Sequence, residues 1–214
     1  MTTVARPFRG VSADDRLRRR RDRLIDAGFA EIAEVGVAGL RMNSVCARAG
    51  LTQRYFYEHF ANRDELLAVL WDALTDELID RTVATVAAQS LDLFARAKAA
   101  LTVFVETVVD DPRKARLFAE ALSVATLAER KSAAVHRYAE FTANQAFIVH
   151  GEQDARTAEQ VKLAALIVVG GQADTAVLWM RNQIALNRRD YIESMAHMFV
   201  DAVTGILERR PVRK

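Results

Sequence analysis

The stretch from Arg41 to Phe60, RMNSVCARAGLTQRYFYEHF, constrains the fold more than any other part of the chain. Apolar residues recur at helical spacing from Val45 to Ala49, and Gly50 follows where a helix C-terminus favours a left-handed residue. Thr52 then offers an N-cap whose hydroxyl can accept a hydrogen bond from an amide of the next helix. The pattern predicts two short helices joined by a tight turn, which is a helix-turn-helix.

The second helix of this unit separates its residues by face. Phe56 and Phe60 have the spacing that buries one face. The remaining side chains are mostly hydrogen-bonding or aromatic and are left for its other faces: Gln53, Arg54, Tyr55, Tyr57 and His59. This outer face is the part of the chain best suited to recognise a polar surface.

The segment GLTQRYFYEHFANRDELL resembles the signature of the tetracycline-repressor-like (TetR) family of transcriptional regulators. In that family a glycine, an apolar residue and a Ser or Thr open the recognition helix, and a Tyr-x-x-Phe end leads into an N-capped fourth helix. The resemblance covers residues 24–69 and is most specific over 45–67. Arg41 and the bulky Arg54-Tyr55 pair depart from the residues common in the family, which affects the expected base preference and not the expected fold.

Helical periods continue along the rest of the 214 residues, and no strand alternation or internal repeat is found. A composition that is 51% hydrophobic with nine Gly and three Pro suits a soluble, mostly helical protein. We expect an all-α fold of about nine helices. Two of them are expected at 91–109 and 113–122, and a third at 126–150, where Gly151 ends it. A Thr157/Gln160 capping box is expected to open the next helix, which runs to Leu186, and the last helix is expected at 190–209. The expected organisation is a disordered tail at 1–11, a helix-turn-helix domain at 12–63, and a larger helical domain at 64–210.

Charge is unevenly divided between these parts. Residues 1–63 hold 12 Lys and Arg against 7 Asp and Glu, whereas the remainder holds 18 against 21. The positive excess therefore accompanies the helix-turn-helix, as expected for a domain that binds a polyanion.

The resemblance implies that the partner is a double-stranded DNA operator read by the helix after Thr52. Gln53, Arg54 and Tyr55 would face base edges, because Gln pairs bidentately with adenine and Arg with guanine. Tyr57 and His59 suit phosphate or thymine-methyl contacts, although His59 is equally compatible with packing against the fourth helix. The full predicted DNA-binding set is Arg41, Asn43, Ser44, Thr52, Gln53, Arg54, Tyr55, Tyr57, His59 and Arg63.

Two further groups of residues have both a DNA-contact and a structural interpretation. In the family the N-terminus of the second helix, expected from Leu40, abuts a phosphate, so Arg41, Asn43 and Ser44 are placed to reach it; alternatively, Asn43 or Ser44 simply caps that helix. Arg6, Arg9 and the six arginines at 16–23 could contact the DNA backbone or remain solvated. Asn62 and Glu65 form a capping pair for the fourth helix, with Arg63 near the phosphates.

For the second domain the resemblance implies a small-molecule cavity and a homodimer. The effector is unknown, and its candidate contacts are Phe94, Phe104, Phe118, Phe141, Gln145, Gln172, Asp174, Trp179 and Met180, although aromatic residues at helical spacing are more often plain core. Asp174 lies inside an apolar helix, where an acid needs a cationic partner. Gly170 and Gly171 in the same helix suit a close helix approach, and the dimer is expected to form through the last two helices.

Other classes of protein have little support. A di-metal carboxylate site needs Glu-x-x-His pairs, and no histidine has a Glu three residues before it; the motifs HExxH, GxSxG, Walker A and GxGxxG are also missing. We therefore expect no enzyme activity, no cofactor and no metal. The lone Cys46 is interpreted as core packing with a redox sensor as the alternative, and a cytoplasmic protein without membrane spans is expected. The competing function is a non-catalytic helical protein-interaction or nonspecific DNA-binding protein.

Overall fold

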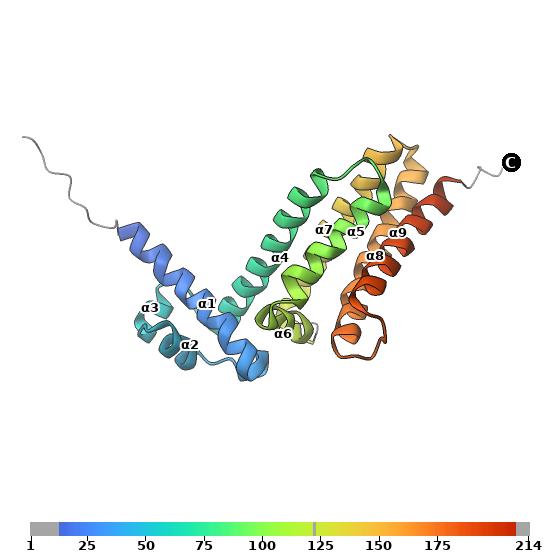
Figure 1. Cartoon of the computed structure of the whole chain (residues 1–214). Coiled ribbons are helices and arrows are strands. Elements are labelled where there is room, and N and C mark those ends of the chain that lie inside the picture. Colours follow the sequence, from blue (N-terminus) through green and yellow to red (C-terminus); the bar gives the residue numbers. More distant parts are fainter. Residues whose placement is uncertain (1–12, 122, 209–214) are drawn as a thin grey trace, which may run out of the picture. The chain divides into compact units, whose positions relative to one another are not determined.

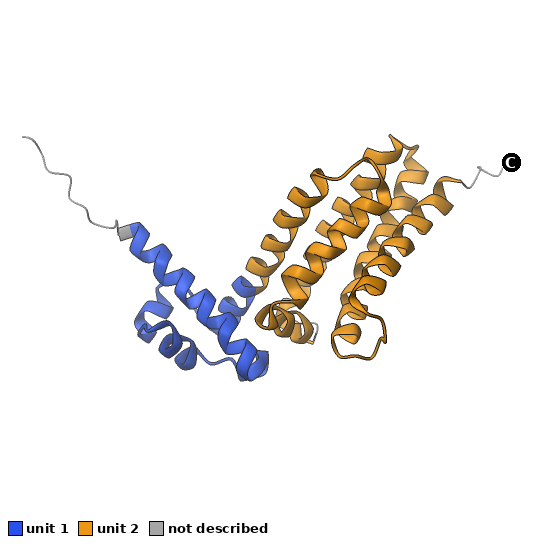
Figure 2. Ribbon diagram, in the orientation of Figure 1, with its two compact units in different colours: residues 1–70 blue, residues 71–214 orange. Residues whose placement is uncertain are grey.

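The structure is a computed structural model that describes residues 13–121 and 123–208. The predicted tail at 1–11, with Arg6 and Arg9, lies outside the described residues. Among those described, nine α-helices and no strand are found, which confirms the all-α prediction (Figure 1). The chain divides between Leu70 and Trp71 into two compact units, coloured separately in Figure 2.

The first unit contains α1 (Ala13–Gly39), α2 (Met42–Ala49), α3 (Gln53–Tyr57) and the start of α4 (Arg63–Ala87). Its core is made of side chains that are almost fully buried: Leu24, Ile32, Val45, Phe56, Phe60, Leu66 and Leu70. Gly28 of α1 permits a close approach to α4, because a Cβ there would lie 3.0 Å from a methyl carbon of Leu70. α1 is interrupted at Gly36, whose φ of 76° and ψ of 174° are not helical, so its regular helical part ends near Val35.

The second unit contains the rest of α4, α5 (Leu93–Phe104), a π-helical turn η1 (Val105–Val109), α6 (Pro112–Ala121), a 3₁₀ turn η2 (Ala125–Leu127), α7 (Ala128–His150), α8 (Ala155–Met180) and α9 (Arg188–Leu207). α7 packs on α8, while α9 packs on both α5 and α8 (Figure 1). One core cluster joins these four helices through buried residues: Leu93, Ala139, Ala143, Ala146, Val161, Ala165, Phe199 and Val203.

Most predicted helix ends are confirmed within one or two residues, and the exceptions have local causes. The second helix begins at Met42 and not at Leu40, because Arg41 is still extended at φ −129° and ψ 136°. The predicted Thr157/Gln160 capping box is wrong, since Asp154 caps α8 by accepting hydrogen bonds from the amides of Arg156 and Thr157. The predicted end of this helix at Leu186 is also wrong: α8 stops at Met180, and Asn182 takes a positive φ of 57°.

Candidate nucleic-acid interface and effector cavity

The turn between α2 and α3 has the predicted geometry. Gly50 is left-handed at φ 61° and ψ 39°, and the amides of Gly50 and Leu51 donate to the carbonyls of Ala47 and Cys46 at 3.1 and 2.9 Å. Cys46 is buried here, and burial raises the pKa of its thiol, which favours the packing interpretation over a redox role. The turn thereby fixes where α3 starts relative to α2.

The outer face of α3 remains exposed. Thr52, Gln53 and Arg54 are exposed, and 87% of the Arg54 side chain is accessible. Gln53 Nε2 donates to Asn43 Oδ1, so the first turns of α2 and α3 present their polar side chains together. Tyr57 is 54% exposed, whereas Tyr55 is half-buried.

α1 supports this face from behind through its arginines. The Arg20 guanidinium lies 4.2 Å from the ring centre of Tyr55, and its Nη1 donates to Glu58 Oε2 at 3.2 Å. Arg23 Nη2 donates to the carbonyl oxygen of Ala49. Part of the arginine run therefore positions α3 and the turn, while Arg19 is exposed.

Neither α2 nor α3 has a side-chain cap at its N-terminus. Arg41 occupies the N-cap position of α2 and Thr52 that of α3, and neither side chain makes the capping hydrogen bond. The prediction that the Thr52 hydroxyl caps α3 is therefore wrong, as is the alternative in which Asn43 or Ser44 caps α2. The first amides of a helix have no acceptor within the helix, so these two ends favour an anion.

His59 and Arg63 are tied into the domain. The Nε2 atom of His59 is buried without a protein partner among the described residues, and desolvation lowers the pKa of its imidazole. This favours the packing interpretation of His59. Arg63 Nη2 donates to the carbonyl oxygen of Val37, and Asn62 and Glu65 form the predicted capping pair, with the Glu65 amide donating to Asn62 Oδ1 at 2.9 Å.

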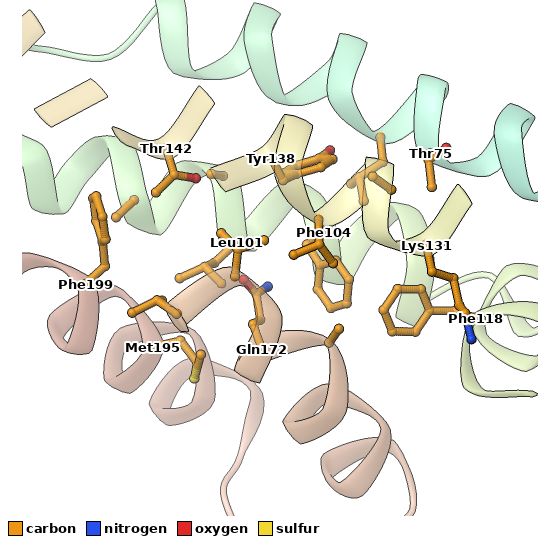
Figure 3. A pocket seen from close by; sticks show the side chains of 18 of the residues that line it. Thr75, Leu101, Phe104, Phe118, Lys131, Tyr138, Thr142, Gln172, Met195 and Phe199 are labelled. Atoms are coloured by element: carbon orange, nitrogen blue, oxygen red, sulfur yellow. The ribbon is translucent and has the colours of Figure 1, made fainter. Parts of the chain in front are cut away.

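The second unit contains an apolar cavity of about 130 Å³ between its helices (Figure 3). Of the predicted effector contacts, Phe104, Phe118 and Gln172 line this cavity. Its wall also includes residues that the sequence analysis did not select: Trp71, Thr75, Lys131, Tyr138, Thr142, Met195 and Phe199. Tyr138 is held by a 3.4 Å contact between its hydroxyl and Thr82 Oγ1, and burial raises the pKa of the phenol.

The other predicted effector contacts lie outside the cavity wall, and several of them contact other residues instead. Phe94 packs against His197 with ring centres 4.4 Å apart and planes tilted by 33°, and Gln145 accepts a 2.7 Å hydrogen bond from the buried Arg96. Trp179 stacks on Tyr191 at 4.3 Å. The argument that Asp174 needs a cationic partner fails because the residue is exposed. Phe141 and Met180 are half-buried elsewhere.

An apolar stripe on α8 is exposed. Leu163 and Ile167 are 57% and 65% exposed, and Leu178 lies farther along the same face. A Cβ on Gly171, between them, would meet nothing within 4 Å. By length and composition α8 could cross a membrane, yet its opposite side carries Val161, Ala165 and Ala176 into the core of the unit.

Comparison with known proteins places this geometry in context. Residues 24–70 match the profile of a family described as bacterial regulatory proteins, tetR family. No curated protein is similar enough in sequence to match the chain.

Solved structures with a similar fold cover nearly the whole chain. A transcriptional regulator from Rhodococcus sp. Rha1 is 24% identical, with 88% of this chain and 96% of that chain covered and a TM-score of 0.61. A TetR family transcription regulator from Marinobacter aquaeolei VT8 is 16% identical, with coverages of 88% and 97% and a TM-score of 0.62. The multidrug binding protein EbrR, complexed with imidazole, is 18% identical, with coverages of 92% and 95% and a TM-score of 0.61. Identities this low show the fold alone.

Proposed function

We propose that this chain, a DNA-binding regulator whose residues 24–70 belong to the tetR family of bacterial regulatory proteins, represses transcription. It would bind a palindromic operator, and a small molecule would modulate that binding. Regulators of this family are generally non-enzymatic and soluble, and we place this one in the cytoplasm. Among the described residues no His, Cys, Asp and Glu side chains group as a metal site would require.

The exposed first turn of α3 carries the DNA-binding part of the proposal. Thr52, Gln53 and Arg54 are exposed at the start of a short helix that Gly50 and the α1 arginines hold in place. Arg54 and Gln53 have the donor patterns that read guanine and adenine in the major groove. The uncapped start of α2 offers backbone amides to a phosphate, with Arg41, Asn43 and Ser44 around it.

The cavity in the second unit supports the effector part of the proposal. It is apolar, is lined by six helices, and contains a few polar side chains, which is the usual composition of a small-molecule site. EbrR, which shares the fold, is described as a multidrug binding protein. We propose that Phe104, Phe118 and Gln172 contact the effector, and that its binding changes the affinity for the operator.

A homodimer through α8 and α9 would account for the exposed stripe of α8. The side chains of Leu163 and Ile167 have no cover in the single chain, and Gly171 would allow a second helix to approach closely. A two-fold dimer presents two copies of α3, which predicts an inverted repeat with half-sites about one helical turn apart or somewhat more.

Selection of bound duplexes from a random pool by the purified chain, at two salt concentrations, tests the proposal. We expect an inverted repeat at both concentrations, with weaker binding at the higher one because phosphate contacts release counterions. Binding that is salt-sensitive but shares no motif would identify a nonspecific DNA binder. No binding to any duplex would instead favour a helical protein-interaction module.

A further inference from the structure

Two groups in the described wall of the effector cavity, the ammonium of Lys131 and the buried indole N–H of Trp71, favour a ligand with a negative charge. We propose that the cavity binds a small amphipathic monoanion. Such a ligand has an apolar, preferably aromatic body and one carboxylate, which lies between Lys131 and Trp71. This inference rests on the proposed function, because it names the chemical class of the effector. Its evidence is the size and lining of the cavity, the sign of its charge, and one buried donor.

The cavity suits a body of about one aromatic ring. Its volume of about 130 Å³ is comparable to that of a protein cavity of about 150 Å³ that holds benzene. Phe104 and Phe118 meet edge to face with ring centres 5.4 Å apart, and Tyr138 and Phe199 add two more rings to the wall. A flat apolar ligand would therefore exchange water for aromatic contacts.

Charge in the cavity wall has one sign. Lys131, from the start of α7, is the one charged residue in the part of the wall that the structure describes, and no Asp or Glu lines it. Figure 3 shows Lys131 beside Phe118 at one end, with Thr142 and Phe199 at the opposite end. The remaining polar side chains are neutral, so the wall attracts an anion and repels a cation.

A buried donor lies in the same region. Trp71, from α4, is 4% exposed and stacks on Phe118 with ring centres 6.1 Å apart. Its indole Nε1 is buried and has no acceptor among the described residues. A buried donor without a partner costs free energy, so a ligand atom that accepts from it would be stabilised. A carboxylate can accept from both Lys131 and Trp71, whereas an ammonium group can accept from neither.

Calorimetric titration of the full chain with three matched probes tests the proposal. Hydrocinnamate, hydrocinnamyl alcohol and phenylpropylamine share one apolar body and differ in the charge of the end group. We expect hydrocinnamate to bind at least about tenfold more tightly than the other two, the factor typical of one charge-assisted hydrogen bond. Weaker or equal binding of hydrocinnamate, or no binding of it, would overturn the proposal.

Variants locate the carboxylate. Lys131→Met should remove the preference for hydrocinnamate over the alcohol, Lys131→Arg should restore most of it, and Trp71→Phe should weaken hydrocinnamate binding severalfold while keeping the ring on Phe118. Lys162→Met, which changes an exposed lysine of α8 outside the cavity, is the matched control and should bind like the unchanged chain. An unchanged preference in Lys131→Met would refute the assignment.

An operator-binding measurement with each probe separates this proposal from the proposed function. Tight and selective binding of hydrocinnamate without any change in operator affinity would leave the ligand class standing and refute the effector response. A change in operator affinity caused by the amine, and not by the carboxylate, would support the effector response and refute the ligand class.

Discussion

The Arg54 side chain is exposed and makes only a long ion pair within the described part of the chain, which suits a side chain that contacts a base. Its Nε lies 3.5 Å from Glu58 Oε1, and 87% of the side chain is accessible. We predict that Arg54→Ala lowers the ratio of operator to scrambled-duplex affinity by about 10- to 100-fold, as expected for the loss of one bidentate base contact. Competition binding with both duplexes measures this ratio. Equal losses on the two duplexes would show that Arg54 contacts the backbone.

Arg63 provides the contrast within the same domain. It donates to the carbonyl oxygen of Val37 and lies 3.6 Å from Asp64, so it connects the start of α4 to the end of α1. Arg63→Ala should therefore lower the free energy of unfolding by about 1.5–3 kcal/mol. It should also weaken binding to all sequences by a similar factor. Thermal denaturation distinguishes the two variants, since Arg54→Ala should leave Tm unchanged.

His59 makes the stability of the first unit depend on pH. Desolvation lowers the pKa of the folded imidazole below its ordinary value of 6.5, while Glu58 opposes and Arg21 and Arg20 assist this shift. Below pH 6.5 the unfolded chain therefore binds a proton at His59 more readily than the folded chain does. The stability that the neutral imidazole contributes is thus complete above pH 6.5, and it is lost as the pH falls through the pKa of the folded chain. Urea denaturation from about pH 7.5 to pH 5 should show a smaller loss of stability in His59→Gln than in the unchanged chain. Parallel losses in both would contradict this assignment.

Arg96 is a buried cation that donates hydrogen bonds to uncharged acceptors. Its Nε donates to the carbonyl oxygen of Ser90 at 2.9 Å and its Nη1 to Gln145 Oε1 at 2.7 Å, which fastens the connection between α4 and α5 to α7. Arg96→Met would leave the buried Gln145 Oε1 without its donor, so we predict a loss of about 1–3 kcal/mol in the free energy of unfolding. Lys98→Met, which breaks the partly exposed ion pair with Glu193, should cost clearly less because solvent screens this pair. Denaturant titration of both variants provides the comparison.

At the scale of elements, Trp179 holds the loop between α8 and α9 in place. Its Nε1 donates to the carbonyl oxygen of Leu186 at 2.7 Å, and its ring is parallel to that of Tyr191 at 4.3 Å. Trp179→Ala should increase amide hydrogen exchange in residues 181–187, because both contacts are lost. Trp179→Phe keeps the stacking and should have a smaller effect. Unchanged exchange in both variants would show that the loop is ordered by other contacts.

The helix-turn-helix could be predicted nearly residue by residue because its determinants are local. Gly50, the apolar period of α2 and the Phe56/Phe60 pair occupy fixed sequence offsets, and the structure places each as expected. The absence of a capping bond from Thr52 could not be predicted, since a hydroxyl can satisfy the amide or leave it for a ligand.

The cavity was less predictable because its wall depends on which helix faces meet. Trp71 has the same period as Leu67, Leu74 and Leu78 and could have been selected as an inward residue of α4. Lys131 carries no local signal, because a lysine in the first turn of a helix is normally solvated. Trp179 lies outside the cavity wall and contacts Leu186 and Tyr191 instead, a difference that sequence does not show because a large aromatic residue near a helix end suits either role.

At the scale of the whole molecule, α8 packs into the core with one face and exposes an apolar stripe on the other. Its inward residues Val161, Ala165 and Ala176 are fully buried in the core of the second unit. Its outward stripe runs from Leu163 through Ile167 and Gly171 to Leu178, and it also carries the exposed Asp174. An apolar stripe of this length on a soluble protein is normally covered by another surface. In the homodimer that we propose, a second copy of the chain would cover the stripe and would also supply a second α3 helix to the DNA.

A charge placed in this stripe tests the dimer and its consequence for DNA binding together. Ile167, which is 65% exposed, can be replaced by Lys without disturbing the core of the single chain. Ile167→Lys should sediment as a monomer at micromolar concentration, because a buried unpaired charge opposes association. It should bind the operator at least about tenfold more weakly, since two linked half-site contacts become one.

Val83→Lys supplies the control, because Val83 is a 46%-exposed apolar residue of α4 outside the stripe. It should remain dimeric and bind the operator normally. A dimeric Ile167→Lys variant with full operator affinity would show that the chain pairs through another surface. A monomeric variant with full affinity would instead separate association from DNA recognition, and the operator would then require only one copy of α3 at a time.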